Sequence, residues 1–278
     1  MTETEKMKNY FEGIEAEVKV AYDIANKARA MGFDTTKTSD VPIAQNMAER
    51  VCGLISALCP SLGIEQEGGK NLIKNIHQLE EKYGALDWRV GFRIAEEVAK
   101  EKFCKFKDKK EAIEIGIRVG FAYLTGGIVS APLEGFVEVK IKKTKDNKDY
   151  FSICYAGPIR GAGGTAAATS VILADYVRVK LGYAEYDPDD KEVNRYATEI
   201  NDYHERCTNL QYKPSDDEIR FLASHLPVEI SGDPTESIEV SNYKDLPRIK
   251  TNIIRGGMCL VFAEGVAQKA PKLWKRLG

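Results

Sequence analysis

The 278-residue sequence lacks most of the features that point directly to a class of protein. It contains three histidines and two tryptophans, and its six cysteines, at positions 52, 59, 104, 154, 207 and 259, form no CxxC pair and no zinc-ribbon spacing. Scattered cysteines of this kind are typical of reduced intracellular thiols. No apolar run approaches the about 18–20 residues that cross a bilayer, and the charged N-terminus lacks a signal peptide's apolar stretch. Secreted, disulfide-rich and membrane-spanning classes are therefore disfavoured.

The near-zero net charge conceals an uneven distribution. Lys and Arg number 40 against 42 Asp and Glu, and 43% hydrophobic with 29% charged residues is ordinary for a globular chain. A disordered or collagen-like protein is excluded, because neither could bury enough apolar surface. Residues 151–240 contain 8 basic and 16 acidic residues, whereas residues 241–278 contain 8 basic and 2 acidic. Any contact with nucleic acid is therefore expected to be local, at lysine clusters and the C-terminal helix.

Helical periodicity dominates the first half of the chain. Residues 4–31 carry apolar side chains at three- and four-residue spacing and predict one long helix, and the polar residues 33–42 predict a linker. The long helix is therefore expected to be a separable arm whose apolar face needs a partner. Further helices are predicted at about 43–58, 69–83, 86–103 and 108–125.

The periodicity changes after residue 127. Alternating side chains on both sides of Asp146-Asn147 predict a β-hairpin with strands near 136–141 and 150–155. Helices follow at about 164–181, 188–208 and 215–225, short strands at 228–230 and 238–240, and a last helix after Arg255. We expect an α+β protein with a short antiparallel sheet and packed helices. Its predicted parts are an arm with its linker (1–42) and a compact domain (43–278), comprising a helical part (43–128) and a mixed α/β part (129–278).

A glycine-rich turn at 156–166 follows the hairpin and opens a helix. Residues 161–166 satisfy the G-x-G-x-x-[GA] pattern of dinucleotide-binding proteins. That function is disfavoured, because the preceding strand belongs to a hairpin and no clear apolar strand follows the helix. Two interpretations stay open: the turn holds a phosphate of nucleic acid, or its glycines only allow close packing on the core. The residues of the phosphate interpretation are Arg160, Gly163, Gly164 and Thr165.

Other basic features support the same two interpretations. Arg255, Gly256 and Gly257 repeat the arrangement of an arginine, two glycines and a helix. Two lysine clusters suit phosphate attraction and base stacking, although a single lysine run is more often a solvated surface. The first comprises Lys100, Lys102, Lys105, Lys107, Lys109 and Lys110 around two phenylalanines, and the second comprises the hairpin residues Lys140, Lys142, Lys143, Lys145 and Lys148.

Catalytic and metal sites are hard to assemble from these residues. The histidines are His77, His204 and His225, and no HExxH motif or second histidine at i+4 is present. His204 lies on a polar helix face, where a surface or interface role is favoured. The acidic residues of 185–240 gather at helix starts, where the helix dipole stabilises them. We therefore assign no catalytic residue and no metal ligand.

Several segments together closely resemble a known family. They are TGGIVSAPLEG at 125–135, YAGPIR at 155–160, GGTA at 163–166, LQY at 210–212, VEI at 228–230, RGG at 255–257 and FAEGVAQK at 262–269. In this order and spacing they resemble the N-terminal region of the large subunit of the archaeal family-D DNA polymerase, also called the DNA polymerase II large subunit. The likeness extends over essentially the whole chain and is weakest at 32–130.

The resemblance implies a role within a larger enzyme. The family's large subunit is several times longer than this chain and pairs with a small subunit that carries a proofreading 3′–5′ exonuclease. Its polymerising aspartates, which hold Mg²⁺ on double-psi β-barrels, and its zinc-binding cysteines lie downstream of the matching region. No residue here takes either role. The family often has hydroxyl residues where this chain has Gly161-Ala162, so any phosphate contact made by those hydroxyls would be missing here.

These observations support one leading hypothesis. The chain is expected to be the non-catalytic N-terminal portion of a DNA-directed DNA polymerase subunit, which positions DNA and helps to assemble the holoenzyme in the cytoplasm, on the nucleoid. Its expected partners are DNA, the small subunit and downstream domains, and we expect the natural polypeptide to continue past Gly278. The alternatives are a pure scaffold and, less favoured, a stand-alone nucleotide-binding enzyme that uses the 161–166 turn.

Overall fold

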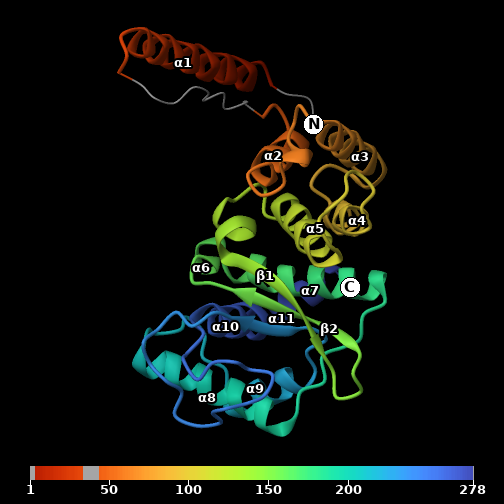
Figure 1. Cartoon of the computed structure of the whole chain (residues 1–278), viewed down its shortest axis with the longest axis vertical. Coiled ribbons are helices and arrows are strands. Elements are labelled where there is room, and N and C mark those ends of the chain that lie inside the picture. Colours follow the sequence, from red (N-terminus) through yellow and green to blue (C-terminus); the bar gives the residue numbers. More distant parts are fainter. Residues whose placement is uncertain (1–3, 34–43, 278) are drawn as a thin grey trace. The chain divides into compact units, whose positions relative to one another are not determined.

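The computed structural model describes residues 4–33 and 44–277, and the chain divides into two compact units, Met1–Gln45 and Asn46–Gly278 (Figure 1). The first unit contains α1 (Glu5–Ala30), which confirms the long helix predicted over 4–31. Thr4 caps this helix, because its Oγ1 accepts the Met7 N–H at 3.4 Å. No residue of α1 is buried. The predicted linker falls almost entirely on residues outside the described part.

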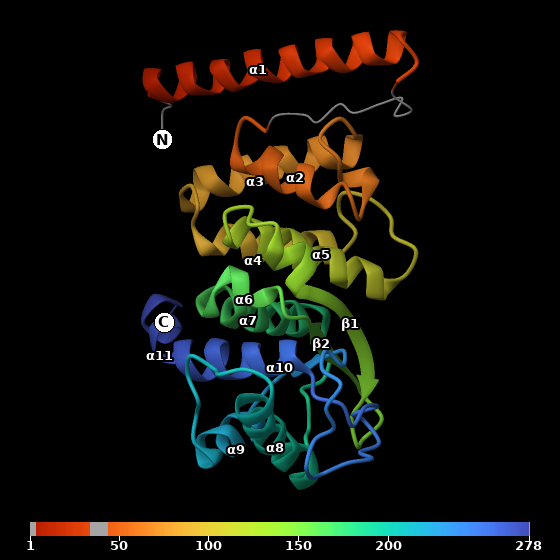
Figure 2. The same cartoon turned by 90° about the vertical axis from the view of Figure 1, so that its left-hand side faces the viewer.

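The second unit begins with the predicted helical part. Its helices are α2 (Met47–Ile55), α3 (Glu67–Tyr83), α4 (Trp88–Ala99) and α5 (Lys109–Leu124), with a short 3-10 turn, η1 (Pro60–Leu62), after α2. Asn46, Asp87 and Asp108 cap α2, α4 and α5 through their side-chain oxygens. Figure 2 shows α4 and α5 as a layer next to α2 and α3. Leu72, Ile94 and their neighbours form a buried apolar cluster among these helices.

A small sheet follows this helical part. A π-helical turn, η2 (Ser130–Gly135), leads into β1 (Phe136–Lys143), which pairs antiparallel with β2 (Asp149–Tyr155), so the predicted hairpin is confirmed. The sheet also has a third strand, β3 (Glu229–Gly232), which pairs parallel with β2, so the sheet is mixed. The predicted strand at 238–240 is a single bridge between Glu239 and Ile253. The sheet order is β1-β2-β3, and the α+β class is confirmed.

Helices connect the two parallel strands. The chain leaves β2 through the short helix α6 (Ile159–Ala162), then α7 (Gly164–Leu181), α8 (Asp190–Arg206) and α9 (Asp216–Ser224). The last three confirm the predicted helices in this region. Asp189 and Glu192 form a reciprocal capping box at the start of α8, and Ser215 caps α9. The connection returns to the sheet beside β2, because a parallel pair requires a crossover rather than a tight turn.

The predicted last helix is continuous but not uniform. It comprises α10 (Gly256–Leu260), a π-helical segment η3 (Val261–Ala267) and α11 (Gln268–Leu277). Its middle packs against α7, and α7 in turn packs on α4 and α5 (Figure 2). The two apolar clusters of the unit therefore meet across α4, α5 and α7. Among the described residues, no helix combines the length and apolar character needed to cross a bilayer.

Phe121 tests this core. Its side chain is fully buried among α5 and the sheet, so Phe121→Ala should lower the free energy of unfolding by about 3–5 kcal/mol. Phe221→Ala is the matched control, because Phe221 is 64% exposed and its loss should change stability by less than about 0.5 kcal/mol. Chemical denaturation followed by circular dichroism measures both. Equal losses would contradict the assigned core.

Candidate nucleic-acid interface

The glycine-rich turn between β2 and α7 is shaped by close packing. Gly163 has a positive φ of 84° and ends α6, and α7 begins at the next residue. A Cβ on Gly164 would lie 2.0 Å from the carbonyl oxygen of Glu264 in η3. At Gly161 the nearest atom would be Ser130 Oγ, at 3.5 Å. Gly164 therefore allows α7 to pack directly on the last helix, as the packing interpretation expects.

Arg160 holds three segments together at this turn. Its Nη2 donates to Glu264 Oε1 at 3.0 Å and to the Asn209 carbonyl at 3.1 Å. The same carboxylate oxygen accepts the N–H of Gln211 at 2.8 Å. The Glu264 side chain is buried, whereas that of Arg160 remains 34% exposed. A guanidinium carries five N–H donors, so the exposed edge of Arg160 is still able to meet a phosphate.

The start of α7 offers free backbone donors beside this arginine. Gly163 provides no side-chain cap, and the N–H groups of Gly164, Thr165 and Ala166 have no acceptor among the described residues. The aliphatic chain of Lys269 lies close to the same turn, with Cε 3.0 Å from the position of a Cβ on Gly164. Free N–H groups and the helix dipole favour an anion at such a position.

The structure places Arg255, Gly256 and Gly257 in the core, and we correct their assignment as phosphate contacts. Arg255 is 1% exposed, and its guanidinium donates to the buried carboxylate of Glu199, with Nη2 2.8 Å from Oε2. Burial disfavours the charge of Arg255, but the attraction and hydrogen bonds of Glu199 outweigh it and raise the pKa of Arg255 above its usual range. Gly257 is required because a Cβ there would lie 2.2 Å from the Tyr155 carbonyl oxygen.

Three of the hairpin lysines, Lys140, Lys142 and Lys143, line a cleft of about 760 Å³ between the sheet and the segment 247–251. Lys140 pairs with Glu138 at 3.1 Å and Asp233 at 3.6 Å, and Lys143 pairs with Asp149 at 2.8 Å. Lys142 is fully used, because its Nζ donates to both oxygens of buried Glu229 at 2.8 Å and to the Arg248 carbonyl at 2.7 Å. Carboxylates therefore compensate the charge of these three lysines.

The neighbouring acidic groups also affect the pKa of Lys140. Burial lowers its pKa, but the charges of Cys154, Glu138 and Asp233 and the hydrogen bond to Glu138 outweigh burial, and the pKa rises to about 12. Four lysines of the other predicted cluster are also ion-paired. Its ion pairs are Lys100 with Glu96, Lys102 with Glu97, Lys105 with Glu101 and Lys110 with Glu138. Most predicted basic positions are therefore paired within the chain.

Positive charge without a carboxylate partner is also present on α11. Lys269, Lys272 and Lys275 form no ion pair with any residue in the described ranges. The sequence did not single out these three lysines as DNA contacts. The excess of basic over acidic residues in 241–278 did indicate that the C-terminal helix is basic. Because α11 packs against α7, these lysines lie on the helix next to the free donors of the glycine-rich turn.

The three histidines make contacts with nearby residues of the chain. The Nδ1 of His204 accepts the Leu210 N–H at 3.1 Å, which is a structural contact. Within residues 4–33 and 44–277, no group of three or more His, Cys, Asp or Glu residues is arranged to hold a metal ion.

Comparison with known proteins first defines the class, which is a family of DNA polymerase subunits. A family described as "DNA polymerase II large subunit DP2, N-terminal" matches residues 9–278. The chain belongs to this family, and the resemblance inferred from the motifs is confirmed. The matching relatives are the DNA polymerase II large subunits of archaea.

The relatives extend well beyond the region compared. The chain is 51% identical over 268 residues to the Nanoarchaeum equitans protein, which covers 96% of this chain and 21% of that relative. It is 42% identical to the Methanothermobacter thermautotrophicus protein, covering 97% of this chain and 23% of that relative. For the Pyrococcus abyssi protein the identity is also 42%, with 97% and 18% covered. The chain thus spans about a fifth of the length of these relatives.

A substitution at Gly164 tests whether the glycine-rich turn is needed for close packing. Gly164→Ala should lower the free energy of unfolding by about 1–3 kcal/mol, because the new Cβ meets a backbone oxygen that cannot move easily. Gly161→Ala is the control, since its Cβ would make only ordinary contacts and should leave stability nearly unchanged. Thermal and chemical unfolding measure both variants. Equal stability of the two variants would show that α7 does not depend on this close approach.

A substitution at Glu199 tests whether Arg255 is buried and paired with it. Glu199→Gln removes the negative charge between Arg195 and Arg255 and should destabilise the protein by about 3–5 kcal/mol. Glu205→Gln, on the exposed side of the same helix, should change stability by less than about 0.5 kcal/mol. Urea unfolding of the two variants compares them. A Glu199→Gln protein as stable as the control would place Arg255 at the surface.

Proposed function

We propose that this chain is a non-catalytic N-terminal portion of a DNA polymerase large subunit, which positions DNA and contributes to holoenzyme assembly. The observation that carries the proposal is the group of uncompensated lysines on α11 beside the uncapped start of α7. Lysines that lack a carboxylate partner displace the counterions bound to DNA phosphates. Paired lysines must first break an ion pair within the protein. The contact is therefore centred on α11 and the glycine-rich turn.

Some of the predicted residues keep a place in this proposal. Arg160 contributes its exposed edge, and Gly163, Gly164 and Thr165 contribute backbone donors at the helix start. On the hairpin, Lys140 and Lys143 are partly exposed and offer weaker contacts at the rim of the cleft. Contacts of this kind fix the position of the backbone and carry no sequence information. The expected binding is thus weak and independent of sequence.

The whole protein is proposed to have the activity that its family name states. A polypeptide with this region at its N-terminus would carry out template-directed DNA synthesis with Mg²⁺ held by residues elsewhere, and would pair with a small subunit that supplies 3′–5′ exonuclease proofreading. It would act in the cytoplasm on the nucleoid. The amphipathic α1, with no buried residue of its own, is a candidate contact for the small subunit or for downstream domains.

Substitution of the α11 lysines tests the DNA contact. The triple variant Lys269→Gln, Lys272→Gln and Lys275→Gln should bind DNA at least about tenfold more weakly near 50 mM salt. The slope of log affinity against log salt should fall by about one for each lysine that meets a phosphate. Fluorescence anisotropy with labelled duplex and single-stranded DNA between about 50 and 200 mM salt measures both quantities.

The matched control removes three lysines that are already ion-paired. Lys70, Lys102 and Lys105 pair with Glu65, Glu97 and Glu101 on the surface, so their replacement by Gln should leave the salt slope nearly unchanged. If both triple variants lose affinity equally, binding follows total charge and the α11 site is wrong. If neither loses affinity, DNA does not contact α11.

A pure scaffold is the second candidate function, favoured by the ion pairing of the hairpin lysines. Co-purification with the small subunit separates the two functions. Loss of DNA binding with intact assembly in the α11 triple variant supports DNA positioning, whereas intact DNA binding with lost assembly supports the scaffold. For a nucleotide-binding enzyme, absence of thermal stabilisation by millimolar NAD or ATP would remove that alternative.

A further inference from the structure

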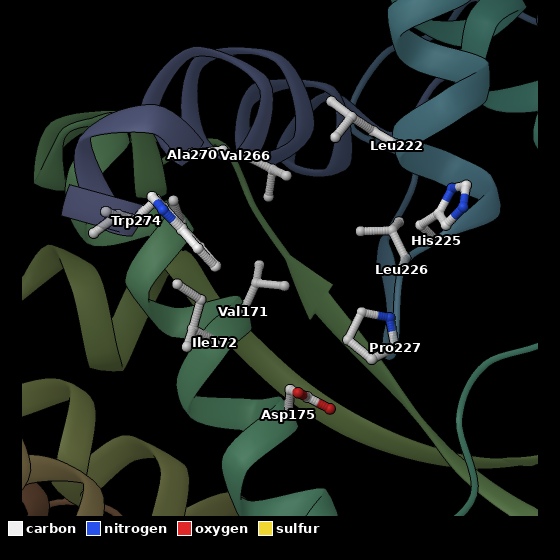
Figure 3. A pocket seen from close by; sticks show the side chains of 12 residues that line it. Val171, Ile172, Asp175, Leu222, His225, Leu226, Pro227, Val266, Ala270 and Trp274 are labelled. Carbon is white, nitrogen blue, oxygen red and sulfur yellow. The ribbon is translucent and has the colours of Figure 1, made fainter. Parts of the chain in front are cut away.

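An apolar pocket of about 460 Å³ opens between α7, the end of α9 and α11. Figure 3 shows Trp274 on one side of it, Leu222, His225, Leu226 and Pro227 on the other, and Val171 and Ile172 between them. This volume is within the range of small-ligand sites, which are mostly apolar with a few polar groups. A helix with its side chains is about 10–12 Å across, so the pocket suits a single planar group better than a helix.

Trp274 is the exposed aromatic group of this pocket. Its side chain is 79% exposed, while its neighbour Leu273 is 4% exposed and anchors the same turn of α11. A planar ligand that stacks on the indole would therefore rest on a ring attached to a packed helix. The apolar side chains of Val171 and Ile172 would also contact the ligand.

Charge and polar groups around the pocket identify the kind of ligand. Lys272 and Lys275 flank Trp274 in sequence and have no ion-pair partner among the described residues. Asp175 lines the pocket, and its Oδ1 accepts the Arg178 Nε at 2.7 Å, which leaves Oδ2 as an acceptor. The site thus combines a stacking surface, nearby cations and a hydrogen-bond acceptor. An unpaired nucleobase with its phosphates has the matching chemistry.

We propose that this pocket binds one unpaired base of single-stranded DNA, stacked on Trp274 with its phosphates beside Lys272 and Lys275. The proposal rests on the proposed function, because it requires DNA to reach α11. It goes further, because it selects single strands over duplex: a base within a duplex is already stacked and cannot enter the pocket. Asp175 accepts a hydrogen bond from an amino or imino group of the base.

Tryptophan fluorescence provides a direct test, because the chain contains only two tryptophans. In a Trp88→Phe background, Trp274 is the single reporter. Titration with a short single-stranded oligonucleotide should quench its fluorescence, and duplex DNA of the same length should not. Trp274→Ala should weaken single-strand binding about 5- to 150-fold and leave duplex binding unchanged, while Trp274→Phe should keep part of the affinity. Unfolding curves of the variants confirm that the exposed position is not needed for folding.

The outcomes separate this inference from the proposed function. If Trp274→Ala binds single strands as well as the parent while the α11 lysine variant binds them weakly, the base pocket is overturned and the DNA-positioning function stands. If the parent binds neither form of DNA, both are overturned. If the small subunit protects Trp274 from acrylamide quenching before DNA is added, and DNA then produces no further change, a polypeptide occupies the pocket and the base proposal is wrong.

Discussion

One buried carboxylate organises the second unit. Glu199 in α8 is fully buried and accepts hydrogen bonds from the side chains of Arg195 and Arg255 and from the Arg255 backbone N–H. Arg195 also donates to the carbonyls of Tyr243 and Thr251, so the cluster joins α8, the loop 243–251 and the start of α10. Two buried guanidiniums share one carboxylate, and their other hydrogen bonds are completed by backbone carbonyls for Arg195 and by Ser231 Oγ for Arg255.

This cluster determines which surfaces remain for binding. It fixes the start of α10 at the ends of β2 and β3, and the close contact at Gly164 then sets α7 against the continuation of that helix. The hairpin lysines and the loop 247–251 close on each other through Glu229 and the Arg248 carbonyl. Carboxylates thus neutralise three lysines of the sheet, whereas three lysines of α11 have no carboxylate partner among the described residues. The ion cluster around Glu199 thus forms a polar core, and the cationic helix α11 remains at the surface.

Local patterns allowed the fold class and most helices to be predicted, and distant pairings account for the errors. The helices over 4–31, 108–125 and 164–181 depend on apolar periodicity and caps within each segment. The parallel pairing of β3 depends on a strand far away in the chain, which no local pattern indicates. Arg255 resembles a phosphate ligand in sequence, but its role is decided by Glu199, 56 residues earlier. Lys142 similarly depends on Glu229, 87 residues later.

The parallel strand pair also has a consequence for how this domain is made. Tyr150 of β2 hydrogen-bonds Glu229 of β3 across 79 residues, so the hairpin leaves the ribosome long before its third strand exists. During that interval one edge of β2 is an open template for unwanted pairing, and Glu199 has no Arg255 to neutralise it. The sheet is complete only when β3 has been synthesised, and the ion cluster only when the chain reaches Arg255, at the start of the last helix. The core of this unit therefore depends on residues from the last quarter of the chain.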